Sequence, residues 1–492
     1  MNERHYDAIV IGSGAGGAAA AYRLVRCGLR VALLEKGPQL PKDGSTLDIR
    51  RVVHQGEFLS REPWLDGAGR RFAPEEHFNL GGKTKWYGAA LLRFAPHEFE
   101  PDGAHGCPGW PIRYDELEPY YAQIEALLGV RHFDIEPDLA RIVGHLTGAG
   151  SPWTAESMPM GLAAGIVHDR AEAAHFDGFA SVRSLKSDSE HSLLSRIMGD
   201  PRLTLLTDTE ALRLLADPAD PQRIVGVATR DGHSLTADSV LLGAGALHSP
   251  RILQRYLATS GLERRLPAAR MVGRNVKLHL LTAMVAMSLT RKSDLIRKTS
   301  VLQHAHFPHS SVQPLGFDGE LIATLIPRFV PRALAAQIGE RSYGFFLQTE
   351  DGSDERNRVV AAADGEPPLL DYDAARLPAA LREHRAFTRA LQRSPAGAGL
   401  IGLTQRIGLA GTAHVCGSLI AGEDPARSVV DRDGAVHGMR GLYVVDGSVL
   451  PRSSRVNPSL TIYAWGLRVA ERLAGRTAQA GRSMPMPTEV AR

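Results

Sequence analysis

Residues 6–35, YDAIVIGSGAGGAAAAYRLVRCGLRVALLE, form the stretch of sequence that decides the fold. An apolar run ending at Ile11 predicts a strand, the small-residue segment 18–24 predicts a helix, and residues 30–34 predict a second strand. Between the first strand and the helix, the letters GSGAGG fill the pattern G-x-G-x-x-G. A glycine motif in this strand, turn and helix context is typical of a Rossmann-like domain that binds a dinucleotide.

The residues of this turn have distinct expected roles. Gly12 permits the tight turn, Gly14 lets the backbone approach a pyrophosphate, and Gly17 lets the helix pack on the sheet. Ser13 lies between the first two glycines and belongs to the same expected cofactor contact. We expect the phosphates at the helix N-terminus, where free N–H groups and the helix dipole favour anions.

Glu35 ends the second predicted strand. A carboxylate at this position can accept hydrogen bonds from both hydroxyls of an adenosine ribose, and it disfavours a 2′-phosphate. The motif therefore argues against NADP and leaves both FAD and NAD open.

Length and composition describe an ordinary globular protein of more than one domain. The chain has 492 residues, which suggests two domains or one domain inserted in another. Hydrophobic residues make up 43% and charged residues 23%, and Lys plus Arg (57) barely exceed Asp plus Glu (54). This balance gives no reason to expect a nucleic acid or an anionic membrane as a partner.

The absence of a targeting signal and the number and spacing of the cysteines favour a cytoplasmic protein. The first strand follows MNERH directly, with no room for a signal peptide, and no apolar run is long enough to span a bilayer. Cys27, Cys107 and Cys416 are odd in number, far apart and without metal-ligand spacing, so we expect free core thiols and no metal. The polar, proline-containing residues 476–492 are expected to form a disordered tail.

The first part of the middle of the chain predicts strands of the nucleotide-binding domain. Strands are predicted where β-branched and apolar runs are bounded by turn residues, at 203–206, 210–216, 224–229 and 239–242. A glycine-rich turn and a helix from Arg251 follow, which indicates a return to the nucleotide-binding domain.

Further on, the pattern predicts a second, substrate-binding domain. Apolar runs at 321–326 and 343–348 predict strands, and residues 378–393 predict a long helix. Upstream, Asp115 is placed as the N-cap of an amphipathic helix that runs to about Leu128.

The C-terminal part contains a polar pair, His414 and Asn457, within a glycine-rich stretch that ends in NPSLT. Together with other segments it resembles the glucose-methanol-choline (GMC) oxidoreductases along nearly the whole chain. The segments that carry the resemblance are GGKTKWYGAALLRF (81–94), WPIRYDELEPYY (110–121), GAGALHSPRIL (243–253), VGRNVKLH (272–279), and the block from His414 to NPSLT.

This resemblance implies an α/β fold with a Rossmann-like FAD domain and an α+β substrate domain built on an antiparallel sheet. The FAD domain is expected to be discontinuous, over residues 1–95, 165–270 and 405–475. The substrate domain is expected over residues 96–164 and 271–404, with the tail from 476.

The resemblance also assigns residues. His414 matches the active-site histidine, which as a neutral imidazole can take the hydroxyl proton of an alcohol. Asn457 matches the second polar position, from which an amide can hydrogen-bond the substrate oxygen and contact the flavin. Further flavin contacts are expected from Gly81 and Gly82, from the backbone of Ala211 near the adenine, and from the backbone of Asp446.

One position departs from relatives whose flavin is covalently attached. Those relatives have a histidine in the glycine-rich segment where this chain has Lys85. We therefore expect noncovalent FAD, and the sequence leaves open whether Lys85 stabilises the reduced flavin or serves the structure.

The expected activity is FAD-dependent oxidation of a CH–OH group of a polyhydroxylated small molecule. A sugar, a glycoside or an aminoglycoside or aminocyclitol metabolite is favoured, because the His/Asn pair resembles the pyranose-oxidising branch. The alternatives are an aliphatic, aromatic or steroid alcohol, a lyase of the hydroxynitrile type, and a flavin electron-transfer subunit without its own substrate. Oxygen, a quinone and a redox protein are all compatible electron acceptors.

Overall fold

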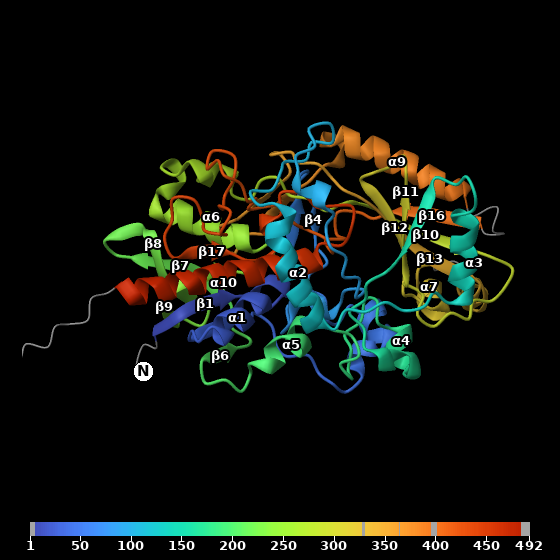
Figure 1. The fold of residues 1–492 in the computed structure, drawn as a ribbon, viewed down its shortest axis with the longest axis horizontal. Coiled ribbons are helices and arrows are strands. Elements are labelled where there is room, and N and C mark those ends of the chain that lie inside the picture. Colours follow the sequence, from blue (N-terminus) through green and yellow to red (C-terminus); the bar gives the residue numbers. More distant parts are fainter. Residues whose placement is uncertain (1–4, 327–329, 364, 395–400, 484–492) are drawn as a thin grey trace, which may run out of the picture.

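We describe the fold from a computed structural model, which covers residues 5–326, 330–363, 365–394 and 401–483. The molecule is elongated, with a different sheet at each end (Figure 1). The blue N-terminal strands, the green strands and the red C-terminal helix gather at one end. The yellow and orange strands form the other end. The predicted mixed α/β fold with two sheet systems is confirmed.

The first sheet has a parallel core around β1 (His5–Ile11). β1 lies between β2 (Val31–Leu34) and β9 (Ser234–Leu242), and all three run parallel. β6 (Leu203–Leu206) and β17 (Leu442–Val444) extend the parallel set. Every residue of β2 is buried, as expected for a parallel strand covered on both faces.

An antiparallel hairpin completes this sheet, and two helices pack beside it. The hairpin consists of β7 (Ala211–Asp217) and β8 (Asp220–Thr229) and joins through β8 to β9. Helix α1 (Ala15–Arg26) and the long C-terminal helix α10 (Ser459–Ser483) lie side by side (Figure 1). The two ends of the chain therefore meet on one sheet.

The second sheet is antiparallel, as predicted for the substrate domain. Its strand order is β16 (Ile401–Arg406), β10 (Leu280–Met287), β13 (Ser342–Thr349), β12 (Ser310–Pro314), β11 (Ser300–His304) and β5 (Trp153–Ser157). Helix α9 (Pro378–Arg393) packs on it and shares a core with Trp153 and Phe345. Nearby helices are α3 (Pro137–Leu146), α7 (Gly319–Thr324) and α8 (Arg332–Glu340).

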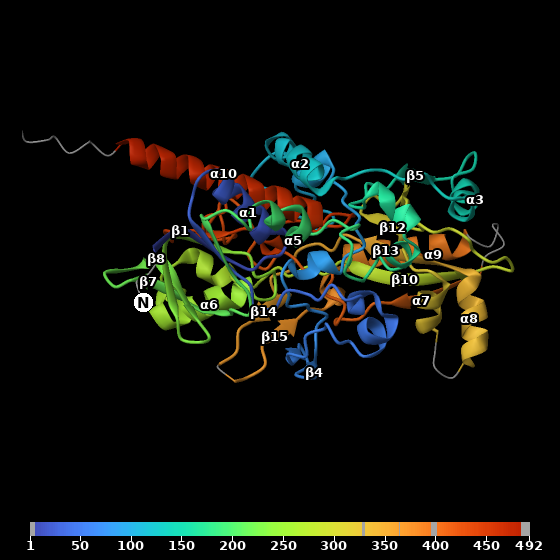
Figure 2. The same ribbon diagram turned by 90° about the horizontal axis from the view of Figure 1, so that it is seen from below.

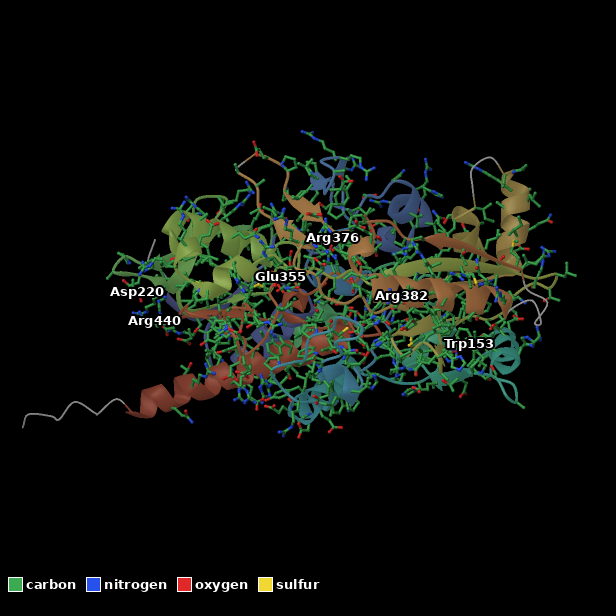
Figure 3. The ribbon with its side chains drawn as sticks, turned by 90° about the horizontal axis from the view of Figure 1, so that it is seen from above. Trp153, Asp220, Glu355, Arg376, Arg382 and Arg440 are labelled. Atoms are coloured by element: carbon green, nitrogen blue, oxygen red, sulfur yellow. The ribbon has the colours of Figure 1, made fainter. Side chains whose placement is uncertain are left out.

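Figure 3 shows how far apart the two sheets reach. Asp220 and Arg440, which form an ion pair, lie at one end, and Trp153 lies toward the opposite end. A small third sheet, β14 (Arg358–Val360), β15 (Leu369–Asp371), β3 (Trp64–Asp66) and β4 (Arg71–Phe72), lies between them.

The remaining helices are α2 (Tyr114–Leu128), α4 (Arg170–Ala174), α5 (Ser189–Ser192) and α6 (Ser249–Ser260). Helices α2 and α10 lie on the face opposite β4, β14 and β15 (Figure 2). The third sheet joins β3 and β4, from a predicted FAD-domain segment, with β14 and β15, from a predicted substrate-domain segment. The domain boundaries stay a prediction.

Four sequence predictions need correction. Residues 321–326 are not a strand, because α7 covers Gly319–Thr324 and Asp318 caps it by accepting the N–H of Leu321. Asp115 is not an N-cap, since α2 begins at Tyr114 and its cap residue is Arg113.

The other two concern the tail and the cysteines. Helix α10 continues to Ser483 because its alanines and arginines favour helix, so 476–483 is not disordered. Residues 484–492 lie outside the described residues. Cys107 and Cys416 are buried free thiols, whereas Cys27 is exposed at the end of α1 and not in the core.

Helix α10 is expected to tolerate no side chain at Gly466. A Cβ there would lie 2.4 Å from the carbonyl oxygen of Gly16 in α1, and backbone cannot move aside easily. Gly466→Ala should lower the free energy of unfolding by about 1–3 kcal/mol, measured by denaturant titration. Gly475→Ala in the same helix meets no described atom within 4 Å and should be neutral or stabilising. Equal stability of the two variants would contradict the predicted close helix contact.

Candidate active site

The glycine turn after β1 is shaped by backbone contacts. Gly12 has φ of +94°, and a Cβ there would lie 2.4 Å from the carbonyl oxygen of Gly243. A Cβ on Gly17 would lie 1.9 Å from the oxygen of Gly12, so this glycine permits the close packing of helix on strand. Gly17 itself is buried and is not on the cavity wall described below.

Gly14 differs from these two glycines. It is the N-cap of α1 without a capping side chain, and a Cβ there would meet no described atom within 4 Å. The first turn of α1 therefore presents its backbone N–H groups to open space, as a phosphate site requires.

Glu35 and Ser13 connect the turn to a second glycine segment. Oε2 of Glu35 accepts hydrogen bonds from the backbone N–H (3.0 Å) and Oγ (2.5 Å) of Ser13, and Oε1 accepts the N–H of Gly37. Burial raises the pKa of Glu35, and these hydrogen bonds oppose that shift. Oγ of Ser13 also accepts the N–H of Gly81 at 2.8 Å.

The second glycine segment approaches the first. Gly81 and Gly82 have φ of +89° and +52°, and a Cβ on Gly82 would lie 3.3 Å from Cα of Gly14. Gly82 is on the cavity wall and Gly81 lies behind it.

Ala211 and Asp446, which the family resemblance also assigns to the flavin site, line the cavity described below. Ala211 begins β7, the edge strand of the first sheet. The carboxylate of Asp446 accepts hydrogen bonds from Gly245, Ser249 and Ser448, so it serves the structure and leaves only its backbone for a cofactor. Burial raises the pKa of this carboxyl.

A single cavity of about 480 Å³ joins both ends of the chain. Its wall includes the turn at 12–16, Glu35, Gly82, Ala211 and Asp446. The same cavity is lined by His414 and Asn457. Residues that are about 400 positions apart in the sequence therefore share one site.

His414 and Asn457 contact each other directly. Nδ2 of Asn457 is 3.2 Å from Nε2 of His414, and the amide N–H donates to that nitrogen. Burial, followed by the nearby His279, Lys298 and Lys83, holds the pKa of His414 well below its usual value. A neutral imidazole is the form that can accept a proton.

A residue of the second sheet fixes the side chain of Asn457. Oδ1 of Asn457 accepts a hydrogen bond from Nε2 of Gln313 on β12. With its oxygen engaged there, the amide turns its nitrogen toward His414.

The cavity wall also includes apolar side chains of the second sheet and a charged pair, neither of which the sequence revealed. The apolar side chains come from the strands and strand ends of the second sheet: Leu281, Leu315, Phe317, Phe346 and Ile407. The charged pair is Lys298 and Asp177, with Nζ 3.1 Å from Oδ2, and both line the cavity. No local motif marks these residues, since Lys298 and Asp177 are 121 positions apart in the sequence.

Other predicted positions are structural. Nζ of Lys85 lies 2.6 Å from Glu190 and 3.1 Å from Asp188, and Lys85 is not on the cavity wall, so its charge is neutralised there. His437, which is also not on the cavity wall, contacts Ser428 and the carbonyl of Gly422 and so serves the structure.

A cluster of His105, His309 and Glu383 has metal-ligand spacing. However, the nitrogens of His309 contact Asp102 and Glu350, at 3.2 and 3.1 Å. Although burial opposes it, the hydrogen bond and charge of Glu350 raise the pKa of His309. Carboxylates on both sides favour the protonated form of the imidazole, which cannot bind a metal.

Comparison with known proteins decides the family. The N- and C-terminal domains of the GMC oxidoreductases match residues 6–281 and 358–466. The chain belongs to the GMC oxidoreductase family. It is accordingly an FAD-dependent enzyme that oxidises CH–OH groups.

Similar GMC proteins span nearly the full chain. A paromamine 6′-oxidase of Streptomyces fradiae is 28% identical and aligns over 96% of this chain and 92% of its own. A 6‴-hydroxyparomomycin C oxidase of Streptomyces lividus is 29% identical, over 97% and 92%. A formate oxidase of Aspergillus oryzae RIB40 has the same fold, with a TM-score of 0.69, 16% identity and coverage of 97% and 100%.

The cavity fits the FAD of this family. Gly14 leaves space beside a helix N-terminus for the pyrophosphate, and Glu35 lies at the end of β2 for the ribose. Within the described ranges, no helix is both long and apolar enough to cross a membrane.

Gly14→Val is expected to remove FAD without unfolding the protein. The new side chain would enter the space of the pyrophosphate, and its Cβ would meet no described protein atom within 4 Å. The purified variant should therefore lose most of its flavin absorbance while keeping the circular dichroism of the wild type. Gly199→Val, an exposed position with no described atom within 4 Å, is the matched control and should keep its FAD. Full FAD occupancy in Gly14→Val would show that the pyrophosphate lies elsewhere.

Proposed function

We propose that this GMC oxidoreductase oxidises a CH–OH group of an aminoglycoside or a closely related amino sugar. The observation that carries the proposal is the contact of His414 with Asn457 inside the cavity that holds the glycine turn. The substrate class is supported by the two Streptomyces relatives, which are named for paromamine and hydroxyparomomycin and align along nearly the whole chain.

The cavity wall suits such a substrate. A sugar ring has apolar C–H faces and polar edges, and the wall combines Phe346 and Leu281 with the ion pair of Lys298 and Asp177. Ammonium groups of an aminoglycoside can interact with the carboxylate of Asp177, whereas a sterol would cover this ion pair with apolar surface and offer it no hydrogen bond.

Proton transfer is assigned to His414. The substrate hydroxyl replaces the N–H of Asn457 at Nε2 of His414, and the imidazole takes the hydroxyl proton. The amide N–H then donates to the substrate oxygen and stabilises its developing negative charge. Bound in this cavity, FAD would supply the hydride acceptor for the carbinol carbon.

The substrate class is tested by anaerobic mixing of the purified enzyme with paromamine. Loss of the oxidised flavin absorbance is expected with paromamine and not with its 6′-deoxy analogue, which lacks the hydroxyl. Methyl glucoside, which has a primary hydroxyl but no amino group, should react more slowly. Bleaching by simple aliphatic, aromatic or steroid alcohols alone would favour the alternative substrates, and no bleaching by any alcohol would favour a lyase or an electron-transfer subunit.

We also propose that FAD is noncovalent and that the enzyme works in the cytoplasm. Lys85 is directed to Asp188 and Glu190, and no cysteine is found on the cavity wall in the described part of the chain. Acid precipitation should therefore release all yellow colour into the supernatant; colour retained by the pellet would contradict this. The free thiols of Cys27, Cys107 and Cys416 suit a reducing compartment.

Removal of His414 is expected to slow flavin reduction while FAD stays bound. His414→Ala should reduce the rate by roughly 10²- to 10⁴-fold, because general-base help is lost. Asn457→Ala should slow it by about 10²-fold through the lost hydrogen bond. In stopped-flow measurements, the wild-type rate should fall only below pH 6.5, since His414 stays neutral above its lowered pKa.

His132→Ala is the control for these variants, because His132 is exposed and is not on the cavity wall. It should react like the wild type. An unchanged rate in His414→Ala would reject the proposed base, and loss of FAD in either site variant would assign that residue a structural role.

A further inference from the structure

His279 lies directly behind His414. It precedes β10, is buried, and is not on the cavity wall. Its Nδ1 is 3.0 Å from Nδ1 of His414, and the two rings are nearly perpendicular, at 85°. The contact is therefore made on the edge of His414 opposite Nε2, the nitrogen that faces Asn457.

The other nitrogen of His279 determines which of its nitrogens carries hydrogen. Nε2 lies 3.0 Å from the carbonyl oxygen of Ser453 and 2.7 Å from that of Ser454. Carbonyl oxygens only accept, so Nε2 of His279 must carry a proton and donate it.

The ring of His279 is expected to be neutral. Its contacts in the described residues are to two carbonyl oxygens and one imidazole, without a carboxylate that could compensate a buried charge. A neutral imidazole protonated at Nε2 has a bare Nδ1. That nitrogen can only accept, so the shared hydrogen belongs to Nδ1 of His414.

The carbonyl groups behind His279 are held in place by buried carboxylates. Oγ of Ser453 donates to Asp351 at 2.7 Å, and Oγ of Ser454 donates to Glu98 at 2.7 Å. Asp351 also accepts the N–H of Leu278, the residue before His279. One carboxylate thus connects both segments that position the ring.

The backbone of this contact is strained on both sides. His279 has φ of +61° and Ser454 has φ of +66°. Six non-glycine residues in the described part of the chain have positive φ, and these two of them are hydrogen-bond partners. Such conformations persist where surrounding contacts enforce them, and they gather at functional sites.

We propose that His279 is a positioning residue that holds His414 in the tautomer with hydrogen on Nδ1 and a bare Nε2 facing the cavity. The inference rests on the proposed role of His414 as the base. A chain of hydrogen bonds therefore connects the carbonyls of Ser453 and Ser454 through His279 to Nδ1 of His414. On the cavity side, the N–H of Asn457 donates to the bare Nε2 of His414.

Because His279 accepts the hydrogen bond as a neutral ring, it affects the pKa of His414 differently from a carboxylate. A carboxylate behind His414 would raise the pKa of His414 and favour its protonated form. An imidazole fixes the ring and its tautomer without adding a negative charge. His414 can therefore stay unprotonated, and its burial and the nearby charges of Lys298 and Lys83 favour the same form.

The tautomer can be measured without turnover. Nitrogen-15 NMR of ring-labelled histidine distinguishes protonated from bare ring nitrogens, and the spectrum of His414→Gln identifies the His414 signals by difference. The holoenzyme without substrate should show His414 protonated at Nδ1 and bare at Nε2. The opposite tautomer, or a doubly protonated ring at pH 7.5, would overturn the proposal whether or not His414 is the base.

Two variants test the function of the contact. Asn and Gly both accept a positive φ, so neither should disturb the backbone. His279→Asn keeps an acceptor oxygen near the place of Nδ1, whereas His279→Gly removes it. His279→Gly should give a mixture of His414 tautomers and reduce flavin about 10- to 100-fold more slowly, and His279→Asn should restore most of the rate and the single tautomer.

Three further outcomes are decisive. A wild-type rate and a single Nδ1-protonated tautomer in His279→Gly with FAD bound would reject the proposal. Equal losses in the Asn and Gly variants, with an unchanged tautomer, would likewise reject it in favour of a packing role. If His279→Gly does not fold, the wild-type spectrum and His279→Asn still decide. A wild-type rate of flavin reduction in His414→Ala would instead reject the proposed function, independently of the role of His279.

Discussion

The close approach of α1 to the C-terminal part of the chain is the constraint on which the rest of the structure depends. A Cβ on Gly16 would lie 1.7 Å from the oxygen of Val445, and a Cβ on Gly466 would lie 2.4 Å from the oxygen of Gly16. Backbone therefore packs on backbone where the first helix meets both the segment after β17 and α10. This contact places the glycine turn after β1 and the residues before α10 on one cavity, which the His414–Asn457 pair also lines.

A buried ion pair supports the segment that contains Ser453 and Ser454. Glu350, next to the end of β13, pairs with Arg452 through two hydrogen bonds of 2.9 and 2.7 Å, and both side chains are almost completely buried. Its Oε1 also accepts the N–H of Ser454. Removing one partner would leave an uncompensated buried charge, which is costly. We attribute to this arrangement the fixed position of the carbonyls that His279 contacts, and through them the orientation of His414.

The sequence predicted the parts of the structure that depend on local pattern. The turn at Gly12–Gly17, the strand β6 and the helix α9 follow from short-range periodicity and turn chemistry, and His414 and Asn457 follow from family resemblance. Residues 321–326 were assigned to a strand wrongly, because a short apolar run fits either a strand or a helix and Asp318 decides for a helix. The roles of His279, Gln313 and Lys298 were not predictable, since their contacts join positions more than 100 residues apart in the sequence.

Oxidation of a carbinol carbon beside His414 is the central claim, and an isotope experiment tests it most directly. Paromamine deuterated at its 6′ carbon would be mixed anaerobically with the holoenzyme, and the rate of flavin reduction would be compared with that of the protiated compound. Slower reduction with the deuterated compound is predicted, because the C–H bond breaks in the step that reduces the flavin. Equal rates, with the first chemical step still visible in the absorbance trace, would contradict the account.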